Sequence, residues 1–255
     1  MYDQFSSNYD RFVNWQGRLA FEMPLLVRLL QPLQISGQVV RVLDAACGTG
    51  MHAIELTRRG FAASGADLSA GMIDQARSNS ATAGLDTRFE AVGFGKLADT
   101  FGVASQDAVL CLGNSLPHAL TAADRRTALT DFSACLRPGG ILVTQNRNFD
   151  KVLAARERWM EPQSFTDSAG DWIFLRFYDY LPDGLINFNI ITLQRAAAGW
   201  QQTVTTTQLY PLRQAELLAG LAEAGFDAVQ LFGSMDGSPY DPVTSDNLIV
   251  SATKE

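Results

Sequence analysis

The chain divides into two parts by the pattern of its hydrophobic positions. Through residues 39–150, short apolar runs alternate with segments whose apolar residues recur at helical spacing. We expect buried strands at residues 39–43, 61–66, 87–92, 107–112 and 141–144. We expect helices at 51–59, 70–78 and 122–136, the second capped by Ser69, and a sharp turn at 137–140. This alternation predicts a parallel sheet with helices on both faces.

The chain beyond residue 150 differs in composition and in hydrophobic pattern. Aromatic residues, Thr and Ile concentrate there, and we expect strands at 172–178, 185–193 and 202–209, which predict an antiparallel β insertion. Helical spacing returns over 214–224, and strands near 228–232 and 248–252 would complete the first sheet. The expected organisation is an N-terminal helical arm or lid (1–38), a ligand-binding core (39–150), a β-rich insertion that caps the substrate (151–210) and a C-terminal completion of the core sheet (211–255).

Composition and charge narrow the class of protein. A hydrophobic fraction of 47% indicates a globular chain rather than a disordered one. The net charge of −7 disfavours nucleic acid as a partner, since a phosphate backbone needs a basic face. Basic residues form no cluster larger than a pair, and no apolar run of about 18 residues occurs, so we expect no membrane partner. Without a signal-peptide pattern, a cytoplasmic location is expected.

Cysteine and histidine usage argues against disulfides and metal sites. The three cysteines lie in apolar surroundings, which suits reduced thiols. With two histidines and no paired Cys spacing, no zinc site is expected.

The most informative segment joins the first strand to the first helix. It reads Asp44-Ala45-Ala46-Cys47-Gly48-Thr49-Gly50. Its glycines let the backbone turn tightly and approach a ligand, and the helix N-terminus offers free N–H groups. Asp67 ends the second strand, where its carboxylate can accept hydrogen bonds from the two hydroxyls of a ribose. A nucleoside ligand is therefore expected at the carboxyl ends of these strands.

Two interpretations of this turn compete. Gly48-x-Gly50-x-x-Ala53 fits the dinucleotide fingerprint of NAD(P)-dependent oxidoreductases. Asp44 favours a different nucleoside, because a carboxylate just before the glycines can accept a hydrogen bond from a ligand ammonium but is a poor neighbour for a pyrophosphate.

Three segments carry a family resemblance. Residues 42–50 resemble the first motif of class I S-adenosylmethionine (SAM)-dependent methyltransferases, and Ala66-Asp67-Leu68-Ser69-x-x-Met72 resembles the second. Leu136-Arg137-Pro138-Gly139-Gly140 is similarly typical. The resemblance covers roughly residues 39–150. It implies an α/β, Rossmann-like, seven-stranded mostly parallel sheet with one antiparallel strand at its end, SAM as cofactor, S-adenosylhomocysteine as product, and no metal.

The resemblance also implies a set of cofactor-binding residues. Asp67 would hold the ribose, Met72 would flank the adenine, and Arg18 would bind the methionyl carboxylate. Around the adenine only backbone N–H contacts are expected, since Gly93 and Phe94 offer no polar side chain. The full set is Tyr9, Trp15, Arg18, Asp44, Ala45, Ala46, Cys47, Gly48, Gly50, His52, Asp67, Leu68, Met72, Gly93, Phe94, Leu112 and Gly113. Tyr9 and Trp15 would close over the site or, alternatively, pack the arm against the sheet edge.

A narrower likeness concerns the acceptor. Residues 111–118 and 146–150 resemble glycine and glycine/sarcosine N-methyltransferases, in which an Asn and an Arg contact the amino-acid substrate. Asn114 and Arg147 match those positions, and a guanidinium fork suits a carboxylate. His118 would accept a proton or bond the substrate, or would instead cap the next helix. The expected catalytic residues are Asn114, Arg147 and His118.

Several functions remain open on the sequence. The first is SAM-dependent N-methylation of a small carboxylate-bearing amine, such as glycine. The others are O- or C-methylation of a larger metabolite in a pocket formed by the insertion, an NAD(P)-dependent oxidoreductase, and a non-catalytic SAM-binding regulator. A nucleic-acid methyltransferase is disfavoured, because the N/D-P-P-Y tetrapeptide is missing after the fourth strand. The oligomeric state is left open.

Overall fold

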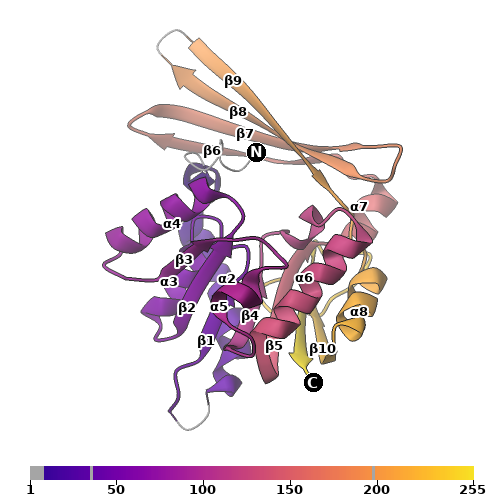
Figure 1. Ribbon diagram of the computed structural model, residues 1–255. Helices are drawn as coiled ribbons and strands as arrows, with labels where there is room; N and C mark the ends of the chain where they lie inside the picture. The colour runs from indigo at the N-terminus through magenta and orange to yellow at the C-terminus, as the bar shows by residue number, and fades with distance from the viewer. Residues whose placement is uncertain (1–8, 35–36, 197–198) are drawn as a thin grey trace.

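Two β-sheets organise the chain, a seven-stranded mostly parallel sheet and a four-stranded antiparallel sheet (Figure 1). The computed structural model describes residues 9–34, 37–196 and 199–255. Residues 1–8 and 35–36 of the expected N-terminal arm lie outside the described residues. None of the helices in these three described stretches is long and apolar enough to cross a membrane.

The larger sheet confirms the predicted α/β, Rossmann-like fold. Its strand order is β10-β11-β5-β4-β1-β2-β3. The bounds are β1 (Arg41–Asp44), β2 (Ala62–Asp67), β3 (Arg88–Ala91), β4 (Gln106–Cys111), β5 (Leu136–Arg147), β10 (Phe226–Phe232) and β11 (Asn247–Lys254). β11 runs antiparallel to both β5 and β10. The antiparallel strand therefore lies one position inside the sheet edge rather than at the end that the resemblance implied.

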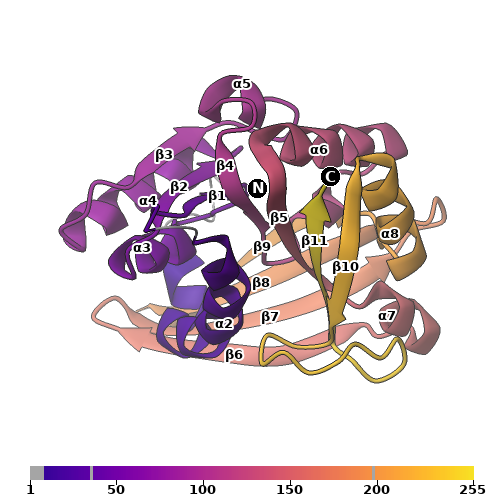
Figure 2. The same cartoon turned by 90° about the horizontal axis from the view of Figure 1, so that it is seen from below.

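Helices cover both faces of this sheet. They are α2 (Trp15–Leu30), α3 (Met51–Arg58), α4 (Ala70–Thr82), α5 (Leu97–Phe101), α6 (Ala122–Cys135) and α8 (Gln214–Glu223), whereas α7 (Phe149–Ala155) packs against the smaller sheet; single 3-10 turns lie at η1 (Gln31–Leu33) and η2 (Leu116–His118). One buried cluster packs α5, α6 and α8 against one face, and another packs α2 and α3 against the other (Figure 2). Ser69 caps α4 as predicted, its side chain accepting from the Met72 N–H.

The smaller sheet has the order β6-β7-β8-β9. Its strands are β6 (Trp159–Asp167), β7 (Gly170–Tyr180), β8 (Ile186–Ala196) and β9 (Gly199–Leu209). The three predicted strands are confirmed, whereas β6 was missed. β6 shows no alternation of buried and solvent-facing positions, because all nine of its residues are exposed or half-buried. The sheet lies across the carboxyl ends of the core strands, like a roof over them (Figure 1).

Three further local differences have simple causes. The turn expected at 137–140 is a bulge within β5, because pairing with β4 resumes after a register shift, and Gly139 supplies a φ of 74°. α5 and α7 were not predicted because they have 5 and 7 residues, too few to show helical periodicity.

Candidate active site

The turn after β1 is held by the end of β2. Gly48 and Gly50 both have positive φ, 53° and 81°, which favours glycine. The Asp67 carboxylate accepts hydrogen bonds from the Gly48 N–H and the Ser69 N–H, both at 2.9 Å. A carboxylate held in this way points hydrogen-bond acceptors at the sheet edge, the kind of group that receives a ligand hydroxyl. The turn thus carries a fixed carboxylate at the sheet edge.

A cavity of about 690 Å³ opens beside this turn. We call it the glycine-turn cavity. It is lined by ten of the predicted cofactor residues, namely Tyr9, Ala45, Ala46, Gly48, Asp67, Leu68, Met72, Gly93, Phe94 and Gly113. Sequence reasoning missed lining residues that follow β4 or lie on α6 and β9, among them Ser115, Asp124, Thr127 and Thr207.

The remaining predicted cofactor residues do not line this cavity, and Arg18 lines the second cavity described below. These are Trp15, Arg18, Asp44, Cys47, Gly50, His52 and Leu112. Gly50 has a packing role, since a Cβ there would lie 2.7 Å from the Phe89 ring. Cys47 and Leu112 are buried in apolar clusters. His52 packs edge-on against Trp15, with ring centroids 5.6 Å apart.

Asp44 is the unsatisfied group of this region. It is 1% exposed, and its Oδ1 atom has no hydrogen-bond partner among the described residues. Burial raises the pKa of Asp44 to about 6. A buried carboxylate oxygen without a donor is costly, and a ligand ammonium would supply one. Together with the Asp67 carboxylate, this fits the two ends of SAM, its amino acid and its ribose.

A buried ionic network ties the arm to the core. Glu22 on α2 contacts His52 Nε2 at 2.7 Å and Arg18 Nε at 3.1 Å. It also accepts from Gln145 Nε2 at 3.2 Å, and Gln145 in turn accepts the Gly113 N–H. Burial alone would raise the pKa of Glu22, but the His52 hydrogen bond and the Arg18 charge lower it to about 2. Arg18 and Gly113 are thereby fixed beside both cavities.

Asp10 provides a second link that the sequence did not indicate. Its Oδ1 atom accepts from Thr49 Oγ1 at 2.5 Å and from Trp15 Nε1 at 2.8 Å. Its Oδ2 atom accepts from Asn79 Nδ2 at 3.0 Å. Tyr9, the neighbour of Asp10, lies beside Gly48. Trp15 therefore packs the arm on the core, while Tyr9 lines the ligand cavity.

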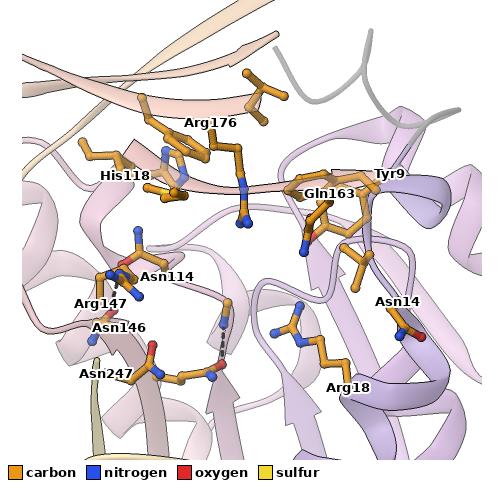
Figure 3. A pocket seen from close by; sticks show the side chains of 18 of the residues that line it. Tyr9, Asn14, Arg18, Asn114, His118, Asn146, Arg147, Gln163, Arg176 and Asn247 are labelled. Carbon is orange, nitrogen blue, oxygen red and sulfur yellow. Dashed lines mark hydrogen bonds between the residues drawn. The ribbon is translucent and has the colours of Figure 1, made fainter. Parts of the chain in front are cut away.

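A second cavity, of about 480 Å³, lies between the core and the antiparallel sheet. We call it the roofed chamber. Arg176 and Gln163 reach into it from the antiparallel sheet, whereas Asn114, Asn146 and Arg147 approach from the core (Figure 3). Tyr9, Gly113 and His118 line both cavities, so the two are contiguous.

Asn114, which follows β4, and Arg147, the last residue of β5, both line the roofed chamber at the edge of the sheet where the sequence predicted them. Asn114 has a φ of 66°, and its Oδ1 accepts the Arg147 backbone N–H at 2.9 Å. The Arg147 Nη2 lies 3.4 Å from Glu157. The Arg147 Nε is buried and, within the described chain, has no hydrogen-bond acceptor. This guanidinium can therefore still receive an anionic ligand group.

His118 lies on η2 at the junction of the cavities. Burial lowers the pKa of His118 to about 4, although a hydrogen bond with the Gln208 backbone opposes the shift. The imidazole is therefore neutral near pH 7, and it is a weak proton acceptor.

Several polar residues of the roofed chamber were not singled out by sequence reasoning. Asn146 is 1% exposed, and neither of its amide atoms has a partner in the described part of the chain. Gln163, Arg176 and Asn247 also line the chamber. Among the aromatic residues of the antiparallel sheet, Trp172 and Phe174 are buried and Phe177 packs against Trp159. No local motif marks these residues, because they come from separate elements.

Comparisons with known proteins agree with this geometry. A family model described as a methyltransferase domain matches residues 42–140. A glycine/sarcosine N-methyltransferase of Aphanothece halophytica is 30% identical over 230 residues, covering 90% of this chain and 80% of that protein. One from Halorhodospira halochloris is 29% identical over 99% of this chain and 88% of its own length.

Solved structures share the fold. A SAM-dependent methyltransferase from Clostridium acetobutylicum superposes with a TM-score of 0.79 at 14% identity, covering 99% of this chain and 98% of that one. DesVI from Streptomyces venezuelae gives 0.78 at 19% identity, with 98% of each chain covered. The motifs at both aspartates and the methyltransferase relatives exclude the oxidoreductase interpretation. The chain therefore belongs to the class I SAM-dependent methyltransferases, resembles their glycine/sarcosine N-methyltransferase group, and is a SAM-dependent methyltransferase enzyme.

Proposed function

We propose that the enzyme transfers the methyl group of SAM to the nitrogen of a small amine that bears a carboxylate. The observation that carries the proposal is the Arg147 guanidinium, whose buried Nε has no acceptor among the described residues and which lines a chamber contiguous with the glycine-turn cavity. The names of the sequence relatives, glycine/sarcosine N-methyltransferases, support the same class of acceptor.

The residues that would hold SAM follow from the fit described above. Asp67 would accept the ribose hydroxyls, and Leu68, Met72, Gly93 and Phe94 would enclose the adenine. Asp44 would accept the ammonium, and Arg18 would receive the methionyl carboxylate. When bound, SAM supplies an electrophilic methyl group on a sulfonium.

The chain contributes orientation above all. Arg147 would bind the acceptor carboxylate in a two-bond fork, and the Asn114 side-chain amide would position the acceptor from the end of the neighbouring strand. Because Asn114 Oδ1 also fixes the Arg147 backbone, the two groups keep a constant spacing. The antiparallel sheet, which we propose as the substrate cap, would exclude water.

Proton transfer places one requirement on the acceptor. The attacking amine must be neutral, and His118, with a pKa near 4, is too weak a base to deprotonate an ammonium efficiently. We infer that the chamber binds the amine in its neutral form and that His118 hydrogen-bonds it. The Arg147 and Arg176 charges disfavour a nearby ammonium and so favour this form.

The test is an assay of S-adenosylhomocysteine release with matched acceptors. Amino acids, their N-methyl derivatives, amines without carboxylates and hydroxy acids are compared, and the product is identified by mass spectrometry. We expect turnover with carboxylate-bearing amines and methylation at nitrogen. Turnover confined to hydroxy acids, or to amines without a carboxylate, would contradict the proposal.

A further inference from the structure

The roofed chamber has more positive than negative charge on its walls. Three guanidinium groups line it, those of Arg18, Arg147 and Arg176. Among the described lining residues Glu22 is the acidic member, and Arg18 and His52 already pair with it. Tyr178 stays a neutral phenol, since burial raises its pKa to about 12. Two cations therefore remain, of which a single acceptor carboxylate would neutralise one.

Arg147 has a partial counter-ion outside the chamber. The Glu157 carboxylate lies 3.4 Å from Arg147 and 3.9 Å from Lys151. Lys151 also contacts Asp246 at 2.7 Å. One shared glutamate thus leaves Arg147 able to bind the acceptor carboxylate of the proposed function.

Arg176 has no acidic partner within the described chain. It lies on β7, its Nη2 donates to the Glu161 backbone carbonyl at 3.5 Å, and its Nε is buried without an acceptor in the described residues. Its guanidinium carbon is 5.2 Å from the centroid of the Phe12 ring. Burial lowers the pKa of Arg176, and the Arg147 charge lowers it further. A buried cation without a counter-ion is unfavourable, so an anion at this place would be stabilised.

The position of Arg176 separates it from Arg147. Arg176 reaches down from the roof, and Arg147 approaches from the carboxyl end of β5 on the opposite side of the chamber (Figure 3). Neutral polar atoms lie in the same chamber, including the unpartnered Asn146 amide and the Gln163 Oε1, neither of which has a hydrogen bond to the described residues. A chamber of about 480 Å³ falls within the range of sites for ligands much larger than glycine.

We propose that the acceptor carries a second carboxylate, which Arg176 binds from the antiparallel sheet, so that the preferred substrate is an amino dicarboxylate rather than glycine. This inference rests on the proposed function, since Arg147 receives the first carboxylate. In this arrangement Arg176 determines specificity, and the roof distinguishes acceptors by their second charged end.

The test compares acids with their uncharged amides. Aspartate and glutamate are assayed against asparagine and glutamine, with glycine and sarcosine as small references, by S-adenosylhomocysteine release. For the wild-type enzyme we expect kcat/KM to be about 10- to 100-fold higher for the preferred diacid than for its amide, the range of one charged hydrogen-bonded contact.

The matched variants are Arg176→Met and Arg176→Lys. In Arg176→Met the preference for the diacid over the amide, taken as the ratio of their kcat/KM values, should fall to about twofold or less, mainly through KM for the diacid. Arg176→Lys should restore part of the preference, since it keeps a point charge but not the fork. The affinity of each variant for S-adenosylhomocysteine serves as the check on folding. It should equal that of the wild type, because Arg176 does not line the glycine-turn cavity.

Four outcomes would overturn the inference. The wild-type enzyme would show no preference for a diacid over its amide, or Arg176→Met would lower kcat/KM equally for both. If only monocarboxylate acceptors are methylated, the proposal of a second carboxylate is wrong, but the proposed function stands. If no carboxylate-bearing amine releases S-adenosylhomocysteine, both fail together.

Discussion

The glycine-turn cavity and the roofed chamber differ in how their polar groups are satisfied. In the first, both Asp67 oxygens already accept backbone N–H groups, and the turn is held by its own chain. In the second, Asn146, Arg147, Gln163 and Arg176 each carry a buried polar atom that lacks a partner in the described residues. Most polar groups of the first region are therefore satisfied within the chain, whereas those of the second can be satisfied by a bound ligand. We therefore expect substitutions in the first to affect cofactor binding, and those in the second to affect the choice of acceptor.

The largest expected effect comes from Arg147→Met. Losing a two-bond fork to a carboxylate costs roughly 3–6 kcal/mol, which corresponds to a drop of about 100-fold or more in kcat/KM. The affinity for S-adenosylhomocysteine, measured by calorimetry, should stay unchanged. If Arg147→Met lowered kcat/KM and the affinity for S-adenosylhomocysteine equally, acceptor binding and cofactor binding would not be separate functions of the two cavities.

The next largest effect is expected at Asp67, whose carboxylate we propose binds the ribose of SAM. Asp67→Asn keeps the size of the side chain but removes its charge and one acceptor oxygen. We expect the Kd for S-adenosylhomocysteine to rise about 10- to 100-fold, because contacts to a charged acceptor are worth roughly 1.5–3 kcal/mol. Calorimetry measures this, with Asn114→Ala as the control that leaves the affinity intact. An unchanged Kd for Asp67→Asn would contradict the assignment.

Asp44, on β1 next to the glycine turn, is the exception to this contrast, because substituting it should have opposite effects on stability and on SAM affinity. Its folded pKa of about 6 exceeds the ordinary value of 3.8, so the folded state holds the proton more tightly. Its contribution to stability therefore falls as pH rises from about 3.8 to 6, and above pH 6 the cost is complete. At about 1.4 kcal/mol per pKa unit, this cost is on the order of 3 kcal/mol.

Asp44→Asn removes the buried charge. At pH 7.5 we expect the ligand-free variant to melt at a higher temperature than wild type, and below pH 4 the difference should disappear. The same substitution should weaken SAM binding, because the ammonium loses its carboxylate. Thermal melts across pH with and without SAM test both effects. A variant that is less stable at pH 7.5 yet binds SAM normally would refute this role of Asp44.

The smallest effect is expected at His118. Because its pKa is near 4, it does not change charge between pH 6 and 8. His118→Gln should lower kcat by less than about tenfold, below the range typical of a general base. The pH profile of kcat should keep its shape in the variant. A loss of about 1,000-fold, or of one limb of the profile, would show that His118 acts as the base.

The two regions also differ in how far the sequence predicts them. Asp44, Gly48 and Asp67 lie within one strand–turn–helix–strand segment, so local pattern and motif locate them together. Asn114 and Arg147 could be paired because they follow neighbouring parallel strands. These predictions depend on contacts that are short in sequence or fixed by sheet order.

Contacts between remote segments could not be predicted. Glu22 bonds Gln145 across 123 positions, and Asp10 bonds Asn79 across 69. Arg176 lies on a strand with ordinary alternation, and its direction into the chamber depends on how the antiparallel sheet is placed over the core. The positions of such side chains depend on tertiary packing, and no local sequence pattern predicts them.

The most direct test of the account is the kcat/KM of the wild-type enzyme for its best acceptor and for the methyl ester of that acceptor, in which the α-carboxylate is blocked. Binding of this carboxylate by Arg147 predicts a ratio of about 100 or more in favour of the free acid. Equal turnover of acid and ester would show that the chamber recognises its acceptor without this carboxylate, and would contradict the account.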